Sequence, residues 1–172
     1  MIKINKNKIE TDIEKIKLFE REKGKNFPNE YIEFLLEYNG GIPEANIFEN
    51  DEVSISIQAF YGLGLSNIDD IRHKVDVLKN RIPEECLPIA EIEGGDVLCM
   101  VLSQENYGEV LLWEHEEEIN EGYANNTNVF KKVSPTFNEL LKEVIPFEVD
   151  GKDDFKVKDI WIDPDFLKEL DS

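Results

Sequence analysis

Two short stretches of this sequence carry side chains that could do chemistry. In the first, Glu93 and Asp96 flank a Gly94-Gly95 pair, and two carboxylates at a turn could bind a metal ion or act as general acid and base. In the second, His115 lies within the acidic run from Glu114 to Glu118, which offers candidate metal ligands. Each stretch also has a simpler interpretation, as a solvated turn and as an exposed acidic edge, and we favour the simpler one.

The motifs that would turn these groups into an active site do not occur in the sequence. The acidic run lacks the H-E-x-x-H spacing that puts two imidazoles on one helix face. Cys99 and His115 could form a nucleophile and its base, but Cys99 stands in an apolar strand pattern and is expected to be buried and inert. There is no nucleophile elbow, phosphate-binding loop or dinucleotide fingerprint. We predict no enzymatic activity, cofactor or metal; a hydrolase using Glu93 and Asp96 is an alternative without motif support.

The charge of the chain is strongly negative and unevenly distributed. It has 38 Asp and Glu residues against 19 Lys and Arg, a formal net charge of -19. Residues 1–35 hold eight basic and seven acidic side chains, whereas the remaining 137 residues hold 11 and 31. Because phosphate binding needs clustered Lys and Arg, direct nucleic-acid binding is disfavoured. A basic protein is the natural partner, since complementary charge steers encounter; the alternative is that the charge only maintains solubility.

Length and hydropathy favour one cytoplasmic domain. A chain of 172 residues with 41% hydrophobic residues can bury a substantial core. The longest apolar run, residues 97–102, is too short to span a membrane, and the N-terminus lacks the apolar segment of a secretion signal. Cys86 and Cys99 lie among apolar residues and are predicted to be buried thiols, with a disulfide between them as the alternative. The sequence does not indicate the oligomeric state.

A helix over residues 28–38 is the best-defined element. Pro28 suits the first helical position, and Tyr31, Phe34, Leu35 and Tyr38 form one apolar stripe. The Asn39-Gly40-Gly41 end favours the left-handed conformation that stops a helix.

The remaining pattern predicts an α+β fold. We expect a helix from a capping box at Thr11 to Gly24, a strand over 53–57, and a helix from Ser66 or Asn67 to Lys79. Strands follow over 86–90, 96–102, 109–114 and 128–133, and a last helix begins with the Ser134-Pro135 pair. Short turns between the strands favour a mainly antiparallel sheet flanked by helices. We predict one domain over residues 1–146 and an extension over 147–172 that packs on it.

Several motifs together resemble the SUKH superfamily, which contains the fungal Smi/Knr cell-wall regulators and many bacterial immunity proteins. They are the helix over 28–38 with its Asn39-Gly40-Gly41 end, Leu87-Pro88-Ile89-Ala90, Gly94-Gly95-Asp96, Gly108-Glu109-Val110 leading to Trp113-Glu114-His115, and Val133-Ser134-Pro135-Thr136-Phe137. These motifs cover residues 10–145 in the order of the family. Phe27, Ala90 and Glu114 stand where the family more often has Leu, Gly and Asp, and these departures keep the chemical class.

The resemblance implies a non-enzymatic domain that binds a cognate toxin, often a nuclease, and blocks its active surface. The alternative is a regulatory scaffold like the fungal members, although the long disordered flanks of those relatives are absent from this sequence. For the toxin contact we select acidic residues of the two stretches above and one aromatic residue of the extension: Glu91, Glu93, Asp96, Glu114, Glu116, Glu117, Glu118 and Trp161. Trp113, at the end of an apolar strand, is predicted to belong to the core.

Overall fold

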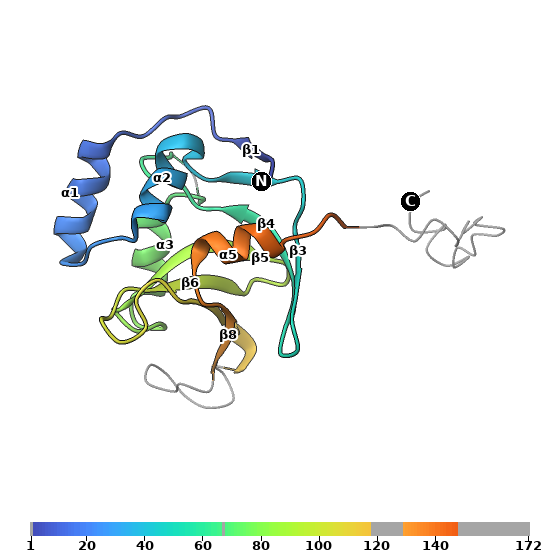
Figure 1. Ribbon diagram of the computed structural model, residues 1–172. Coiled ribbons are helices and arrows are strands. Elements are labelled where there is room, and N and C mark those ends of the chain that lie inside the picture. Colours follow the sequence, from blue (N-terminus) through green and yellow to red (C-terminus); the bar gives the residue numbers. More distant parts are fainter. Residues whose placement is uncertain (1, 67, 118–128, 148–172) are drawn as a thin grey trace, which may run out of the picture.

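The structure, a computed structural model, describes residues 2–66, 68–117 and 129–147 (Figure 1). Its centre is an eight-stranded sheet with the order β1-β2-β4-β5-β6-β7-β8, and β3 pairs with the first half of β4. The strands are β1 (Ile4–Lys6), β2 (Gly41–Pro43), β3 (Ile47–Glu49), β4 (Ser54–Phe60), β5 (Cys86–Ile92), β6 (Val97–Val101), β7 (Val110–Trp113) and β8 (Phe130–Ser134). Because each of these pairings is antiparallel, the predicted α+β fold is confirmed.

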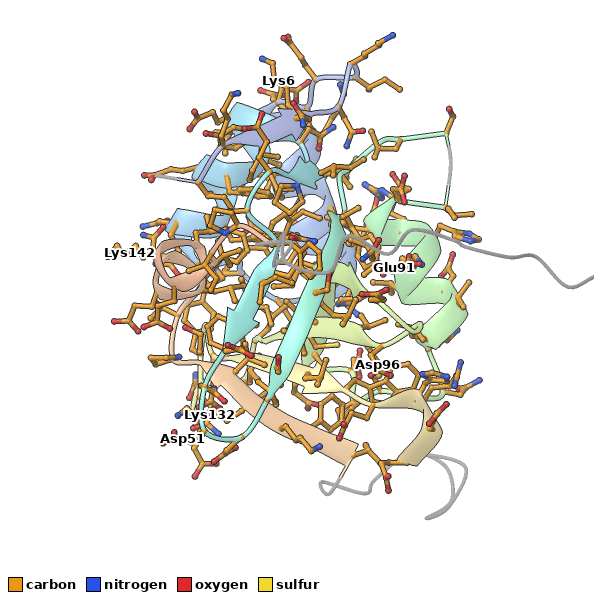
Figure 2. All side chains as sticks on the ribbon, turned by 90° about the vertical axis from the view of Figure 1, so that its right-hand side faces the viewer. Lys6, Asp51, Glu91, Asp96, Lys132 and Lys142 are labelled. Carbon is orange, nitrogen blue, oxygen red and sulfur yellow. The ribbon has the colours of Figure 1, made fainter. Side chains whose placement is uncertain are left out.

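The helices cover both faces of the sheet. Those of the described part are α1 (Ile13–Lys23), α2 (Asn29–Tyr38), α3 (Ile71–Leu78) and α5 (Phe137–Glu143). In Figure 2, α2 and α5 lie on one side of the sheet and α3 lies on the other. No helix within the described ranges is long and apolar enough to cross a membrane.

Aromatic rings join α2 and α5 to the sheet. The ring centroid of Phe34 lies 5.2 Å from that of Phe60 on β4 and 4.9 Å from that of Phe137 on α5, with edge-on geometry. Tyr31, one turn earlier on α2, also meets Phe137 edge-on at 5.1 Å. All four rings are buried. Truncating one such ring to alanine typically costs about 3–5 kcal/mol, so this cluster is a main contributor to the stability of the domain.

The end of α2 attaches the helix to the sheet as well as stopping it. Asn39 adopts the left-handed conformation with φ of 50°, as predicted. Its buried side-chain amide donates to the carbonyl oxygens of Ile9 and Leu63 at 2.9 and 3.1 Å, and its Oδ1 accepts from the Leu63 N–H at 2.8 Å. A Cβ on Gly40 would lie 2.6 Å from the backbone oxygen of Phe60. The glycine is therefore required for close approach to β4 as well as for its positive φ.

Two predicted helix starts are shifted, and a third is wrong by several residues. The cap of α1 is Asp12, which accepts from the Lys15 N–H at 2.9 Å, and the capping box predicted at Thr11 is not formed. Pro28 precedes α2 as its N-cap and is not its first residue. The start of α3 is capped by Asp70, so the helix predicted from Ser66 or Asn67 begins only at Ile71.

The last helix and three strands also differ from expectation. The N-cap of α5 is Thr136, two residues after the serine that was predicted, and its side chain accepts from the Glu139 N–H. The strands β1, β2 and β3 were not predicted. Each has only three residues, which is too short for a periodic apolar pattern to emerge.

Candidate functional site

Antiparallel pairing brings the two acidic stretches of the sequence together. Val97, the first residue of β6, lies opposite Trp113, the last residue of β7. The β5–β6 turn and the residues that follow β7 therefore meet at one end of the sheet. We call this region the acidic corner and define it by five residues: Glu93, Asp96, Glu114, Glu116 and Glu117. Residues 115–117 are helical.

Asp96 and His115 form the structural link within the acidic corner. Asp96 Oδ1 accepts from the backbone N–H of His115 at 3.0 Å and lies 2.7 Å from its ring Nδ1. Both side chains are partly exposed. A Cβ on Gly95 would lie 3.6 Å from the His115 ring, and this glycine has φ of 98°. Asp96 is thus a turn residue that also accepts a hydrogen bond from the first helical N–H after β7.

Two of the selected carboxylates are already in ion pairs. Glu114 lies 2.8 Å from the Lys131 ammonium on β8, and the resulting hydrogen bond raises the pKa of Lys131 above its ordinary value. Glu91 lies 2.8 Å from the Lys74 ammonium, which itself sits 4.9 Å from the ring centroid of Tyr61. Glu91 is set on β5 before the turn, so it is not part of the acidic corner.

Two of the residues selected from the sequence, Glu118 and Trp161, lie outside the described residues. Trp113 is buried, as predicted, and the Arg81 guanidinium stacks 4.7 Å from its ring centroid. Both cysteines are free and buried, which confirms the predicted thiols. Burial raises the pKa of the Cys99 thiol well above its ordinary value, so it stays protonated and is not an activated nucleophile.

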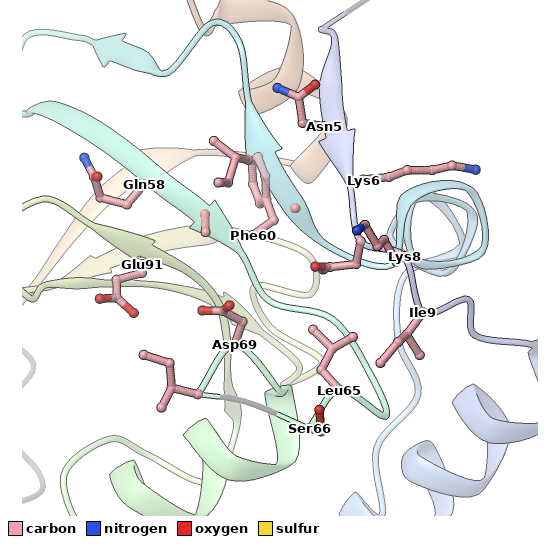
Figure 3. A pocket seen from close by; sticks show the side chains of 15 residues that line it. Asn5, Lys6, Lys8, Ile9, Gln58, Phe60, Leu65, Ser66, Asp69 and Glu91 are labelled. Carbon is pink, nitrogen blue, oxygen red and sulfur yellow. The ribbon is translucent and has the colours of Figure 1, made fainter.

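Beside the acidic corner lies a hollow that the sequence analysis did not predict. Its volume is about 630 Å³, and it is bounded by β1 and the residues after it, by β2, β4 and β5, and by the loop before α3 (Figure 3). We call it the isoleucine groove because three partly exposed isoleucines line it: Ile9, Ile42 and Ile68, which are 45%, 58% and 62% exposed. Ala59, Phe60 and Leu65 add further apolar surface.

The charged residues of the isoleucine groove lie at opposite sides. Figure 3 shows Lys6 and Lys8 on the β1 side, whereas Asp69 and Glu91 lie across the groove. No signal in the sequence marks this site, because its lining comes from four separate segments and none of them carries a motif. The described residues contain no group of three or more His, Cys, Asp or Glu arranged to hold a metal ion.

The order of elements and the motifs that they carry define the class of this α+β domain. Residues 10–143 match the SMI1/KNR4 family (SUKH-1), and the chain belongs to that family. This confirms the resemblance found in the signature helix, the central strands and the last helix. A relative in Bacillus subtilis (strain 168) is the SPbeta prophage-derived uncharacterized protein YokK. It is 25% identical over 176 residues, which cover 90% of this chain and 85% of the relative.

Proposed function

We propose that this chain is an intracellular immunity protein that binds a basic toxin and covers the active surface of the toxin with the acidic corner. The observation that carries the proposal is the convergence of five carboxylates at one end of the sheet. Lys131 pairs with one of them and His115 with another. Membership of the SUKH family, in which immunity proteins are common, supports the same conclusion.

The charge of the acidic corner suits a nuclease as the target. A nuclease presents Lys and Arg to the phosphate backbone of its substrate. An acidic surface is attracted to that region, which speeds encounter and selects against partners of the wrong charge. Inhibition by coverage needs no bond making or breaking by the inhibitor, so the proposed function involves no catalytic residue, cofactor or metal.

The ion pairs at Glu91 and Glu114 fit a preorganised contact surface. Lys74 and Lys131 hold these two carboxylates in place, and a basic partner side chain can share either carboxylate without displacing the lysine, because a carboxylate has two acceptor oxygens. Glu93 and Glu117 are exposed, and we expect them to contribute mainly to long-range attraction.

The test co-expresses this chain with the toxin domain encoded by the gene next to its own. We expect the chain to restore growth, and to bind the purified toxin domain much more tightly at low salt than at about 0.5 M, where exposed charges are screened beyond roughly 4 Å. A charge-reversed variant of the acidic corner should lose both effects: Glu93→Lys, Glu116→Lys and Glu117→Lys.

A matched control separates the acidic corner from net charge. It carries the same number of charge reversals at exposed positions on α2 and in the β3–β4 turn: Glu33→Lys, Glu37→Lys and Glu52→Lys. We expect the control to protect as the wild type does. Equal protection by the corner variant would contradict the proposal. Binding of several unrelated proteins without protection from any toxin would favour a regulatory scaffold.

A further inference from the structure

We infer that the isoleucine groove receives an apolar segment of the partner protein, and that this segment carries basic side chains toward the acidic corner. The inference rests on the proposed function for the identity of the partner as a toxin. It adds a second, apolar part to the contact surface, formed by Ile9, Ile42 and Ile68. The acidic corner alone offers charge but little apolar area.

The exposure of the three isoleucines is the first argument for a bound segment. Leaving a side chain of this size in water forgoes about 1.5–3 kcal/mol relative to full burial. Single exposed apolar residues are common, but a group that lines one hollow is typical of an interaction site. Specific protein interfaces combine an apolar centre with a polar rim, and the groove provides such a centre.

The groove and the acidic corner are connected through Glu91. On β5, Glu91 lies opposite Ala59 of β4, which lines the groove, and opposite Val97 of β6, which directly follows Asp96 of the corner. Figure 2 shows Glu91 and Asp96 on the same side of the molecule. A partner that fills the groove therefore has the acidic corner beside it, and its flanking side chains meet carboxylates.

The other wall gives the bound segment a direction. Lys6 and Lys8 belong to the β1 side of the groove, and no ion pair involves either of them within the described ranges. Asp69 and Glu91 lie across from them (Figure 3). A segment with basic residues at one end and an acidic side chain or free carbonyl groups at the other fits this arrangement in one orientation only. Charge complementarity at both ends thus favours a protein segment over a uniformly apolar ligand.

The test selects a phage-displayed library of random dodecapeptides against the full chain. We expect enriched peptides with two or three apolar residues followed or preceded by Lys or Arg. Their affinity should fall at least tenfold for the double variant Ile42→Ser with Ile68→Ser. A matched double variant, Leu18→Ser with Leu36→Ser, removes similarly exposed side chains from α1 and α2 and should bind as the wild type does.

Circular dichroism and thermal unfolding establish that both double variants are folded. Failure to enrich any peptide over the Ile42/Ile68 double variant would overturn the inference, and so would peptides that bind this variant and the wild type equally. A wild-type dimer in sedimentation equilibrium that the same variant dissociates would assign the groove to a second copy and also overturn it. Failure of toxin protection alone leaves the peptide result unaffected and counts against the proposed function only.

Discussion

Glu30 on α2 accepts a hydrogen bond from the backbone N–H of Phe137 at the start of α5, with a distance of 2.9 Å from its Oε1. The same oxygen lies 3.3 Å from the N–H of Asn138. These are N–H groups that the first turn of a helix leaves without a partner inside the helix. A carboxylate 107 residues away in sequence therefore completes the cap that Thr136 begins, and it fixes α5 against α2.

We predict that Glu30→Ala lowers the free energy of unfolding by about 1–2 kcal/mol, because it removes a capping acceptor and a negative charge from the positive end of the helix dipole. Glu30→Gln should cost less, since its side-chain oxygen can still accept. Urea denaturation of both variants measures the difference. As a control, Glu33→Ala lies one turn away, is exposed, and should change stability little. Equal stability of Glu30→Ala and wild type would contradict the capping role.

Asn39 should be among the least replaceable polar residues of the domain. Its side chain makes three hydrogen bonds to backbone groups of Ile9 and Leu63, and the residue is buried. Alanine leaves those backbone groups without partners, at about 1–3 kcal/mol for each one that water cannot reach. We therefore expect Asn39→Ala to lower the unfolding midpoint in urea strongly, and Asn39→Asp to cost less because only the donor is lost. A loss below about 1 kcal/mol for alanine would contradict this account.

The elements that were predicted correctly are those whose cause is local. The strands β5, β6 and β7 and the helix α2 each carry an apolar pattern long enough to identify them from sequence. The start of α3 was wrong for a non-local reason. Ser66 and Asn67 are both good capping residues, but Asp70 accepts from the N–H groups of Arg72 and Leu65, so its carboxylate caps the helix and closes the preceding loop.

The candidate site was predictable only in part for the same reason. Sequence marked Asp96 and His115 as members of separate acidic stretches, but only the antiparallel register placed them in contact. The pairing of Glu91 with Lys74 joins β5 to α3 and has no local signature. The isoleucine groove depends on four segments meeting, and each isoleucine on its own resembles an ordinary surface residue.

The buried thiol of Cys86 should make stability depend on pH in the alkaline range. Burial, with a smaller effect of Glu85, raises the pKa of Cys86 from 9.0 to about 11. A raised thiol pKa favours the folded state only while the thiol stays protonated, so its contribution is complete below pH 9 and is lost as the pH rises to 11. The free energy of unfolding should fall over that interval by up to about 1.4 kcal/mol per pH unit.

The comparison with Cys86→Ala isolates this contribution, because the buried tyrosines titrate equally in both proteins. Denaturation at pH 8, 9, 10 and 11 should give curves that converge for wild type and variant as the pH rises. At pH 8 the folded wild type should react slowly with iodoacetamide, since the thiolate is the reactive form. Parallel stability curves across this range would show that Cys86 does not titrate as described.

The link between Asp96 and His115 should control the order of the acidic corner. Asp96→Ala removes the acceptor for the His115 N–H and for its ring, and we expect faster amide hydrogen exchange at residues 115–117. Asp96→Asn keeps an oxygen at the same place and should preserve the backbone hydrogen bond. If the alanine variant exchanges at the wild-type rate, Asp96 does not organise the corner. If it exchanges faster and also releases a bound toxin faster, while asparagine does neither, then the loss of binding follows from disorder of the surface. The charge lost at Asp96 is the same in both variants, so charge alone cannot explain a difference between them.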